Sequence, residues 1–294
     1  MKIATYNVCL HPIINPSINH TQKKILHDIL THDELVSCDV ICFQELFKWY
    51  INSQFVNMKS TNDNIQNKYD IISMILGHSS NIFGFNNREL IYDYHIEEFI
   101  STLKSLGFQY FCVSDISPNE MNIKSNSGLM IASKIPIIEK HEYLLSVSLW
   151  VPNRTLLIVK LSNGIYVSTL HLSPTMPLNG FKNDLQVLDE LSIVQKYIKK
   201  ICGHHKCVLA GDFNIGYKTE QFYAMCNQLG VKPIKNLSIT WRASNREKNF
   251  YKNDDNESIC DYIIGLNGVR YKKKNSTILT IDASDHYPVI ADLV

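Results

Sequence analysis

The chain has 294 residues, of which 45% are hydrophobic and 10% aromatic, and its formal net charge is +1. This composition supplies enough apolar side chains for a sizeable core and excludes a largely disordered chain. So small a net charge also excludes a general attraction to nucleic acids or anionic membranes, so any contact with a polyanion must be local.

In chain order, strand-like and helix-like segments alternate. Short apolar runs at 2–8 and 39–45 end in polar residues, which is typical of buried strands. Residues 22–36 and 91–107 carry apolar side chains at helical spacing, and Gly107 favours the end of the second of these helices.

The later segments are richer in strands. Residues 154–172 contain Asn163-Gly164 between two β-rich runs, which is a strong hairpin signal. Residues 184–201 predict a helix. Further strands are predicted at 128–133, 207–210, 258–265, 276–282 and 286–294. Hairpins mixed with strand–helix alternation favour an α/β (α+β) sandwich over a purely parallel sheet.

The sequence contains no linker that divides it into regions of different composition. Two polar stretches, 52–68 and 244–257, are typical of surface loops or insertions, and neither separates regions of different composition. We therefore expect a single domain over residues 1–294. Nothing in the sequence indicates an obligate protein partner, so we expect a monomer.

The eight cysteines are scattered among mostly apolar neighbours, as is typical of buried free thiols in a reducing compartment. Cys202 and Cys207 near His204 and His205 allow the alternative of a metal site, but Cys207 opens an apolar run. The N-terminus carries no signal-peptide pattern, and no apolar run reaches membrane-spanning length. We expect a soluble intracellular protein, cytoplasmic or nuclear.

Polar residues recur where the apolar strands end, and Asp261 lies inside an apolar run. A buried carboxylate is costly unless it is paired or bound to a cation. Strand ends on one side of a sheet converge readily on one ligand site. The residues in question are Asn7, Glu45, His171, Asp212, Asn214, Asp261, Asp285 and His286.

The residue types in this set point to a chemistry. Carboxylate and amide oxygens without cysteine suit Mg²⁺ or Mn²⁺ better than zinc. Two histidines beside a carboxylate-held cation suggest proton transfer and stabilisation of developing negative charge. These are the requirements of phosphoester hydrolysis.

Eight short motifs occur in one order between Asn7 and His286: TYNV, FQE, SGLMIASKIPI, TLHL, GDFN, TW, CDYI and SDH. In this order they resemble the endonuclease/exonuclease/phosphatase superfamily, the deoxyribonuclease-I-like, metal-dependent phosphoesterases. The resemblance implies a four-layer α-β-β-α sandwich, with two mixed β-sheets packed face to face and helices outside.

The resemblance also implies roles for the site residues. Glu45 would be the principal ligand of Mg²⁺ or Mn²⁺, with Asn7 and Asp285 beside it, and Gln44 would orient the cluster. Trp241 in the TW motif would be a pocket wall or a core anchor.

The remaining implied roles concern catalysis. His286 would be the general base on the attacking water, with Asp261 holding its imidazole. Asp212 and Asn214 would position the water and hydrogen-bond the phosphate. His171 would stabilise that phosphate or protonate the leaving group.

Each of these residues also has an ordinary structural reading. Asn7 can satisfy a strand end, Glu45 can be a solvated tip, and Asp261 can belong to a buried salt bridge. Arg154 and Arg242 can contact a phosphate or lie in solvent. The ordered co-occurrence of the motifs favours the functional reading for the motif residues.

The substrate is less determined than the reaction. His171 followed by Leu, and Cys9 two residues after Asn7, resemble the deoxyribonuclease and sphingomyelinase branches more than the repair endonucleases. The basic run 270–274 is a solvated hairpin tip or a polyanion contact, and the tryptophan-containing segments 47–55 and 148–152 are core or a bilayer contact.

We therefore expect a metal-dependent hydrolase of phosphodiesters, acting on nucleic acid or phospholipid. One alternative is a phosphomonoesterase of the inositol-polyphosphate phosphatase type. Another is a non-catalytic binding module that has kept the fold.

Overall fold

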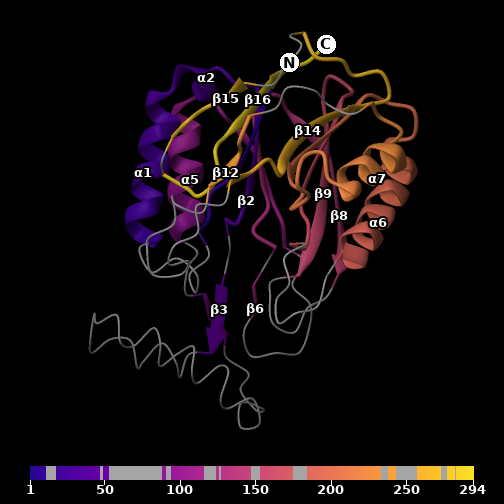
Figure 1. Ribbon diagram of the computed structural model, residues 1–294. Coiled ribbons are helices and arrows are strands. Elements are labelled where there is room, and N and C mark those ends of the chain that lie inside the picture. The colour runs from indigo at the N-terminus through magenta and orange to yellow at the C-terminus, as the bar shows by residue number, and fades with distance from the viewer. Residues whose placement is uncertain are drawn as a thin grey trace, which may run out of the picture.

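Two β-sheets pack face to face between two layers of helices (Figure 1). This is a computed structural model, and the residues that it describes are 1–10, 18–46, 49–52, 88–90, 94–115, 124–125, 127–146, 153–174, 184–232, 238–242, 257–272, 277–281 and 283–294.

The first sheet has six strands, with β1 and β2 parallel and the other neighbours antiparallel. Its helices α1 (Ile18–Thr31), α2 (Asp33–Val36) and α5 (Tyr94–Ser105) lie on the outer face. The strand order is β15 (Thr277–Ile278), β16 (Val289–Asp292), β1 (Lys2–Asn7), β2 (Val40–Gln44), β7 (Met130–Ser133) and β5 (Tyr110–Val113).

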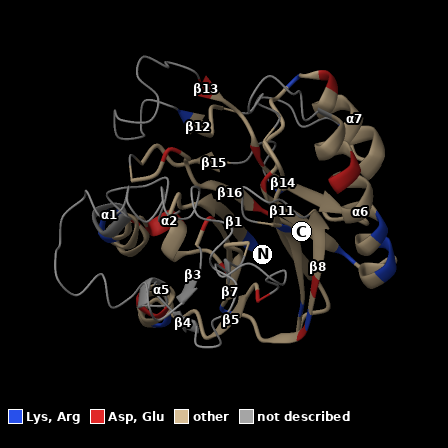
Figure 2. Ribbon diagram, turned by 90° about the horizontal axis from the view of Figure 1, so that it is seen from below, with Lys and Arg blue, Asp and Glu red and all other residues tan. Residues whose placement is uncertain are grey.

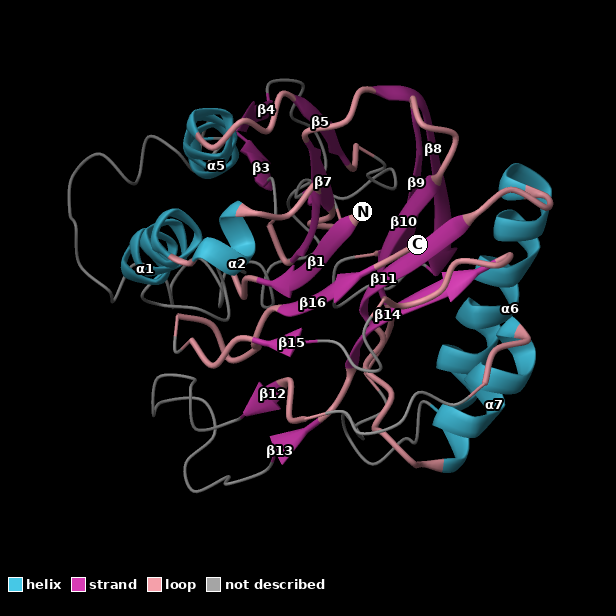
Figure 3. Ribbon diagram, turned by 90° about the horizontal axis from the view of Figure 1, so that it is seen from above, coloured by secondary structure: helices cyan, strands magenta, loops and turns pink. Residues whose placement is uncertain are grey.

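The second sheet has five strands, with only β10 and β11 parallel. Helices α6 (Asp184–Cys202) and α7 (Glu220–Leu229) lie on its outer face, as the view from above shows (Figure 3). The strand order is β14 (Asp261–Leu266), β11 (Cys207–Asp212), β10 (Tyr166–His171), β9 (Arg154–Leu161) and β8 (Ile137–Ser146).

Two small sheets extend this body. One pairs β3 (Trp49–Asn52) with β4 (Arg88–Leu90) and β6 (Lys124–Ser125), and the other pairs β12 (Trp241–Arg242) with β13 (Glu257–Ser258). The β12 backbone also bridges to His286, which links this ribbon to the start of the last strand.

The core follows from strand alternation. In β2, Val40 and Cys42 belong to the cluster between the sheets, whereas Ile41 and Phe43 pack with the helices outside. In β11, Val208 belongs to the cluster between the sheets. The even and odd positions of a strand therefore face different layers, which confirms the four-layer α-β-β-α sandwich.

The helix predicted over 22–36 is wrong in its continuity. His32 adopts an extended backbone (φ −89°, ψ 106°) and precedes the separate short helix α2. The apolar spacing continues through the break because Leu35 of α2 packs into the same cluster as Ile25 of α1. A pattern of apolar residues therefore does not show that the helix axis has been interrupted.

Other predictions of local structure are confirmed. Gly107 (φ 89°) ends α5 and Gly164 (φ 84°) lies in the turn between β9 and β10. The predicted strand 276–282 is shorter, since only Thr277–Ile278 of its described residues pair. Helix α7 and strand β5 had no counterpart in the sequence-based prediction.

Two further expectations bear on the environment of the protein. All eight cysteines are free and buried, as expected. Cys202 and Cys207 are buried, whereas His204 and His205 are exposed, so no joint metal site forms among these four. Within the described residues, no helix is both long and apolar enough to cross a membrane. The loops proposed at 52–68 and 244–257 lie outside the described residues, apart from Asn52, which ends β3, and Glu257, which begins β13, and the single domain stays a prediction.

Candidate active site

The register of the second sheet places three site residues in one row. His171 of β10 pairs with Asp212 of β11, and Asp212 pairs with Asp261 of β14. Asp212 lies on the same face of β11 as Val208, and Asp261 lies on the same face of β14 as Ile263. Val208 and Ile263 both pack in the space between the sheets. Strand alternation therefore carries a histidine and two carboxylates into the same inter-sheet edge.

The first sheet contributes the facing pair. Asn7 of β1 pairs with Gln44 of β2, again at the ends of parallel strands. Gln44 accepts a hydrogen bond from Thr5 Oγ1 (3.1 Å) and donates one to Thr169 Oγ1 of the other sheet (2.9 Å). Gln44 therefore links the two sheets next to the site, and the orienting role expected for it stays a prediction.

Glu45 reaches the site through an unusual backbone. By alternation, the residue after Gln44 would face the helices, but Glu45 has φ 59°, in the left-handed region that a side chain with a Cβ rarely adopts. Its carboxylate instead accepts a hydrogen bond from Asn7 Nδ2 at 3.1 Å. Such strain is typical of functional positions.

Asp212 receives several donors at the end of β11. Asn7 Nδ2 donates to its Oδ2 (3.0 Å), and the backbone N–H of Asn214 donates to its Oδ1 (2.8 Å). Asn214, at φ 51°, donates its side-chain amide to the Leu172 carbonyl (2.8 Å). Asn214 thus holds the ends of β10 and β11 together.

Gly211 lies within β11 and not in a turn. It has φ 150°, and a Cβ placed there would clash with the carbonyl oxygen of Leu170 on the neighbouring strand. Only glycine lets the two backbones approach so closely immediately before the site.

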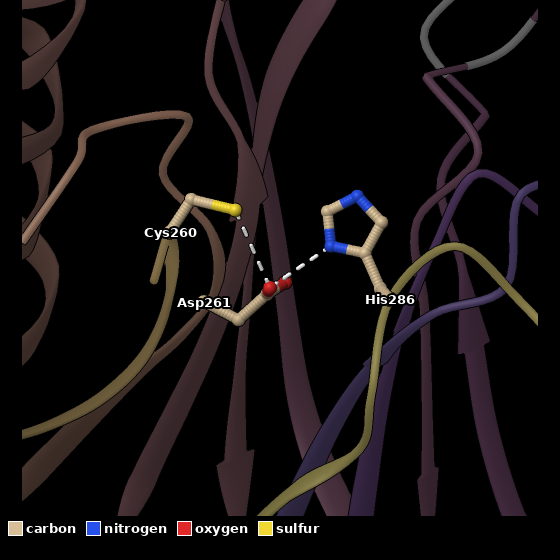
Figure 4. A group of neighbouring side chains, drawn as sticks. All are labelled: Cys260, Asp261 and His286. Atoms are coloured by element: carbon tan, nitrogen blue, oxygen red, sulfur yellow. Dashed lines mark hydrogen bonds and ion pairs between the residues drawn. The ribbon is translucent and has the colours of Figure 1, made fainter. Parts of the chain in front are cut away.

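A histidine–carboxylate pair completes the cluster (Figure 4). His286 Nδ1 lies 2.9 Å from Asp261 Oδ2, and the other ring nitrogen points away from that carboxylate. His286 Nε2 lies 3.7 Å from Asp212 Oδ2, and His171 Nε2 lies 3.4 Å from the same oxygen. Both imidazoles therefore face Asp212 from two different strand ends.

Asp285 is positioned by its neighbours in the SDH and TW motifs. Trp241 Nε1 donates to Asp285 Oδ2 (3.2 Å). Ser284 Oγ donates to the Asn7 carbonyl (2.8 Å), and the Ser284 hydroxyl accepts the His286 backbone N–H (3.2 Å). Ser284 thereby links β1 to the segment that carries Asp285 and His286.

Thr240 has a role that the motif comparison did not assign. Its Oγ1 accepts the backbone N–H groups of Cys260 (3.0 Å) and Asp261 (3.2 Å). It therefore fixes the start of β14, from which Asp261 projects. The signal available in the sequence was the threonine of TW, which stands beside the tryptophan already considered.

The electrostatics of the cluster are dominated by buried acids. Burial, and after it the Asp261 carboxylate, raise the pKa of Asp212 from 3.8 to about 7 against the opposing effect of His286. Burial alone lowers the pKa of His286, but Asp261 and then Asp212 outweigh it and raise that pKa from 6.5 to about 10. The site therefore holds more negative charge than its imidazoles balance.

Arg154 is a buried cation near the cluster, and no feature of the sequence distinguishes it from the other arginines. It is 7% exposed, its side chain forms no ion pair within the described part of the chain, and its buried Nε has no hydrogen-bond partner there. Burial lowers its pKa, while Glu190, Glu45 and Asp212 act to raise it. Glu190 already accepts bonds from Ser146 and Ser173.

The donor set fits a hard divalent cation. Among the described residues, four acids lie at least nine-tenths buried in or beside the cluster with three groups that can carry positive charge, and acids buried together are costly unless a cation accompanies them. These acids are Glu45, Asp212, Asp261 and Asp285, and the cationic groups are His171, His286 and Arg154. Acidic positions gather between β1, β11 and β14 in the view from below (Figure 2).

One detail qualifies the ligand set expected from the resemblance. The Asn7 amide nitrogen, not its oxygen, faces Glu45 and Asp212, while Asn7 Oδ1 accepts the Cys9 backbone N–H (3.0 Å). For Asn7 to bind a cation through oxygen, this amide must turn. Of the segments considered for substrate contact, 148–152 lies outside the described residues, as do 47–48 and 53–55 of the segment 47–55 and 273–274 of the basic run 270–274.

Comparison with known families agrees with this geometry. The model of the endonuclease/exonuclease/phosphatase family matches residues 4–286. The chain belongs to this family. Members of the family are phosphoesterase hydrolases, and they generally depend on divalent metal ions. No curated protein sequence matches the chain.

Several solved structures share the fold at low sequence identity. Beta toxin from Staphylococcus aureus has a TM-score of 0.67 at 15% identity, covering 99% of both chains. Sphingomyelinase C from Streptomyces griseocarneus has 0.62 at 15%, covering 99% of this chain and 98% of the other. The mannosyl-6-phosphatase Bt3783 from Bacteroides thetaiotaomicron has 0.58 at 15%, covering 100% and 99%. A double mutant of beta toxin holds bound magnesium ions.

Proposed function

We propose that this protein hydrolyses phosphodiester bonds with the help of Mg²⁺ or Mn²⁺. The observation that carries the proposal is the His286–Asp261 pair, 2.9 Å apart, with His286 Nε2 directed to the Asp212 side of the cluster and Asn7 and Glu45 beside it. A base, its orienting carboxylate and a cation-binding acid then converge on one point.

Glu45 and Asp285 would hold the cation, joined by Asn7 once its amide has turned. When bound, the cation supplies charge neutralisation, both for the phosphate and for the carboxylates that otherwise keep His286 protonated at neutral pH. Its absence should therefore disable the base as well as weaken phosphate binding.

The protein's own groups then carry the proton transfer. Asp261 holds the Nδ1–H of His286, which leaves Nε2 to take a proton from the attacking water. The water oxygen forms a new bond to phosphorus and the bond to the leaving oxygen breaks. The leaving oxygen takes up a proton from His171 or from solvent, and His286 releases its own proton to solvent before the next turnover. His171, which faces Asp212 from the opposite side, hydrogen-bonds the phosphate as charge develops.

Asp212 and Asn214 have complementary roles in this scheme. Asp212 lies between the two imidazoles and is placed to orient the water. Asn214 fixes the Asp212 carboxylate through its backbone N–H and locks the adjacent strand end through its amide. This is a positioning role, in addition to the phosphate contact that the resemblance implies.

Arg154 adds a phosphate-binding group. A buried guanidinium without an ion-pair partner in the described structure is costly, and an anionic substrate would supply the missing partner. The fields of Glu45 and Asp212 at Arg154 place it within electrostatic reach of the site.

Nucleic acid and phospholipid are the two substrate classes to be compared. The likeness to sphingomyelinase C supports a phospholipid diester, and the family description supports a nucleic acid. A phosphomonoester is the second candidate, supported by the likeness to the mannosyl-6-phosphatase. A non-catalytic module is disfavoured because the residues expected for catalysis and metal binding are all present.

The free, buried thiols support an intracellular location, cytoplasmic or nuclear. We propose that the chain acts as a monomer without an obligate protein partner.

The test is hydrolysis of bis-(p-nitrophenyl) phosphate with Mg²⁺, beside p-nitrophenyl phosphate, DNA, RNA, sphingomyelin vesicles and inositol polyphosphates. We expect turnover of the diester that is lost in EDTA and falls at least about 100-fold in His286→Gln. Full activity in EDTA, or a His286→Gln enzyme equal to wild type, would contradict the proposal. Faster turnover of the monoester would select the second candidate.

A further inference from the structure

A third side chain lies against the histidine–carboxylate pair. The thiol of Cys260, the residue before β14, lies 3.5 Å from Asp261 Oδ2, the same oxygen that His286 Nδ1 contacts at 2.9 Å (Figure 4). One ligand atom from each of the three residues lies within 4.8 Å of the other two. All three residues are at least nine-tenths buried.

We infer that Cys260, Asp261 and His286 form a site for a thiophilic divalent cation, typified by Zn²⁺, and that its occupation inhibits the enzyme. The binding part of this inference stands on the cluster alone, whereas the inhibition rests on the proposed function.

The geometry is close to that of a tetrahedral site. Zn–S bonds of about 2.3 Å and Zn–N or Zn–O bonds of about 2.0 to 2.2 Å place neighbouring ligand atoms about 3.3 to 3.6 Å apart. The Sγ–Oδ2 distance of 3.5 Å already meets this requirement, and the 2.9 Å between Nδ1 and Oδ2 needs only a small expansion. The sulfur and Nδ1, which lie within 4.8 Å of each other, must move closer together when the cation binds.

Charge and donor type favour the same occupant. A thiolate, a carboxylate and a neutral imidazole sum to −2, which a divalent cation neutralises within a buried cluster. The cation replaces two protons, one from the thiol and one from Nδ1. Burial raises the pKa of Cys260 well above its usual value, so the thiol keeps its proton until a cation with a strong preference for sulfur displaces it.

Asp261 also offers a second oxygen atom that could coordinate the cation. Its Oδ1 is buried and has no hydrogen-bond partner among the residues that the structure describes. A carboxylate that binds through both oxygens would satisfy this atom, and a water could complete the coordination.

The site differs from the Mg²⁺ site in position and in chemistry. It uses the Nδ1 side of His286, whereas the Nε2 side faces Asn7 and Asp212. It includes sulfur, which Mg²⁺ avoids, while Glu45 and Asp285 offer only oxygen. A cation here would replace the Nδ1–H that Asp261 holds, so His286 could no longer act as an oriented base.

Binding is tested first, with Cd²⁺ and Co²⁺ as probes of the full chain. We expect wild type to show a thiolate-to-metal charge-transfer absorption band that saturates with metal. In Cys260→Ala we expect that band to be weaker by the amount that one bound metal ion per chain contributes. Cys202→Ala is the control, because Cys202 and Cys207 form a close pair of buried thiols away from this cluster, with 3.6 Å between their sulfur atoms. Circular dichroism checks that each variant folds.

Inhibition is tested next, with Zn²⁺ added to the Mg²⁺-activated hydrolysis of bis-(p-nitrophenyl) phosphate. We expect Cys260→Ala to need at least about tenfold more Zn²⁺ than wild type for half inhibition, because a ligand is missing. An unchanged charge-transfer band in Cys260→Ala overturns the site, as does equal Zn²⁺ sensitivity of the variant and wild type. A band without any hydrolase activity leaves the site intact and refutes the proposed function instead.

Discussion

His286 and Asp261 are 25 residues apart in sequence, and their side chains meet at 2.9 Å between Nδ1 and Oδ2. The contact joins the segment before β16 of one sheet to the start of β14 of the other. It orients the imidazole so that Nε2 faces Asp212. The proposed role of His286 requires this orientation, because Nε2 would accept a proton from the attacking water.

Removing the carboxylate while keeping its shape tests this orientation. We expect Asp261→Asn to lower kcat by about 10² to 10⁴-fold, because the amide can favour the wrong tautomer of His286. The measurement is kcat and KM for the diester beside the thermal midpoint Tm. Asp115→Asn, at an exposed acid paired with Lys140, is the matched control and should retain full activity. Equal losses in both variants would point to a general effect of charge.

Cation affinity should depend on Glu45. We expect Glu45→Gln to weaken binding of Mn²⁺ at least about tenfold, since an amide replaces a carboxylate ligand. Calorimetry or electron paramagnetic resonance of Mn²⁺ measures the affinity without reference to turnover. Glu139→Gln, at a half-buried acid of β8 that pairs with Lys160 away from the cluster, should bind as wild type does. Unaltered Mn²⁺ affinity in Glu45→Gln would remove Glu45 from the ligand set.

The stability of the cation-free protein should fall as pH rises. The folded-state pKa values of Asp212 (about 7, from 3.8) and His286 (about 10, from 6.5) are both raised, so the folded chain binds more protons than the unfolded chain. The stability that these groups contribute is full below their unfolded pKa values and is lost as pH rises through about 7 and then about 10.

Thermal unfolding in EDTA measures this dependence. We expect the Tm of wild type to decline between pH 6.5 and 10, and to decline less in Asp261→Asn, where the main carboxylate that raises the His286 pKa is gone. A variant that declines as steeply as wild type would show that His286 does not carry the effect.

Arg154 separates a ligand role from a structural one. If the Arg154 guanidinium binds the substrate phosphate, Arg154→Met should raise KM by at least about tenfold. The Tm should stay unchanged or rise, because the substitution removes a buried charge that has no ion-pair partner among the described residues. Arg270→Met, at an exposed position, is the control. A lower Tm with an unchanged KM would assign Arg154 to the fold instead.

Gly211 tests the close approach of β10 and β11. Gly211→Ala places a methyl group against the Leu170 carbonyl, in backbone that cannot move without disturbing Asp212. We expect a loss of about 2 kcal/mol or more in the free energy of unfolding. Gly203→Ala has open space around its Cβ and should cost less, as chemical denaturation will show.

Local patterns in the sequence were sufficient for much of this structure. Apolar alternation in the strands predicts that Asn7, His171 and Asp212 continue the face that packs between the sheets. The motif order predicts the family, the four layers and most of the site residues. Apolar alternation and short motifs depend only on residues that are close together in the chain, so a single sequence is enough to recognise them.

Only the tertiary structure decided how these residues meet. The row formed by His171, Asp212 and Asp261 depends on hydrogen-bond registers between strands that lie far apart in the chain, and packing of both sheets sets those registers. The left-handed turn at Glu45 reverses what alternation predicts. Two further features depend on the surroundings of a residue, which no single stretch of sequence contains: the Arg154 Nε without a partner among the described residues, and the Cys260 thiol beside Asp261.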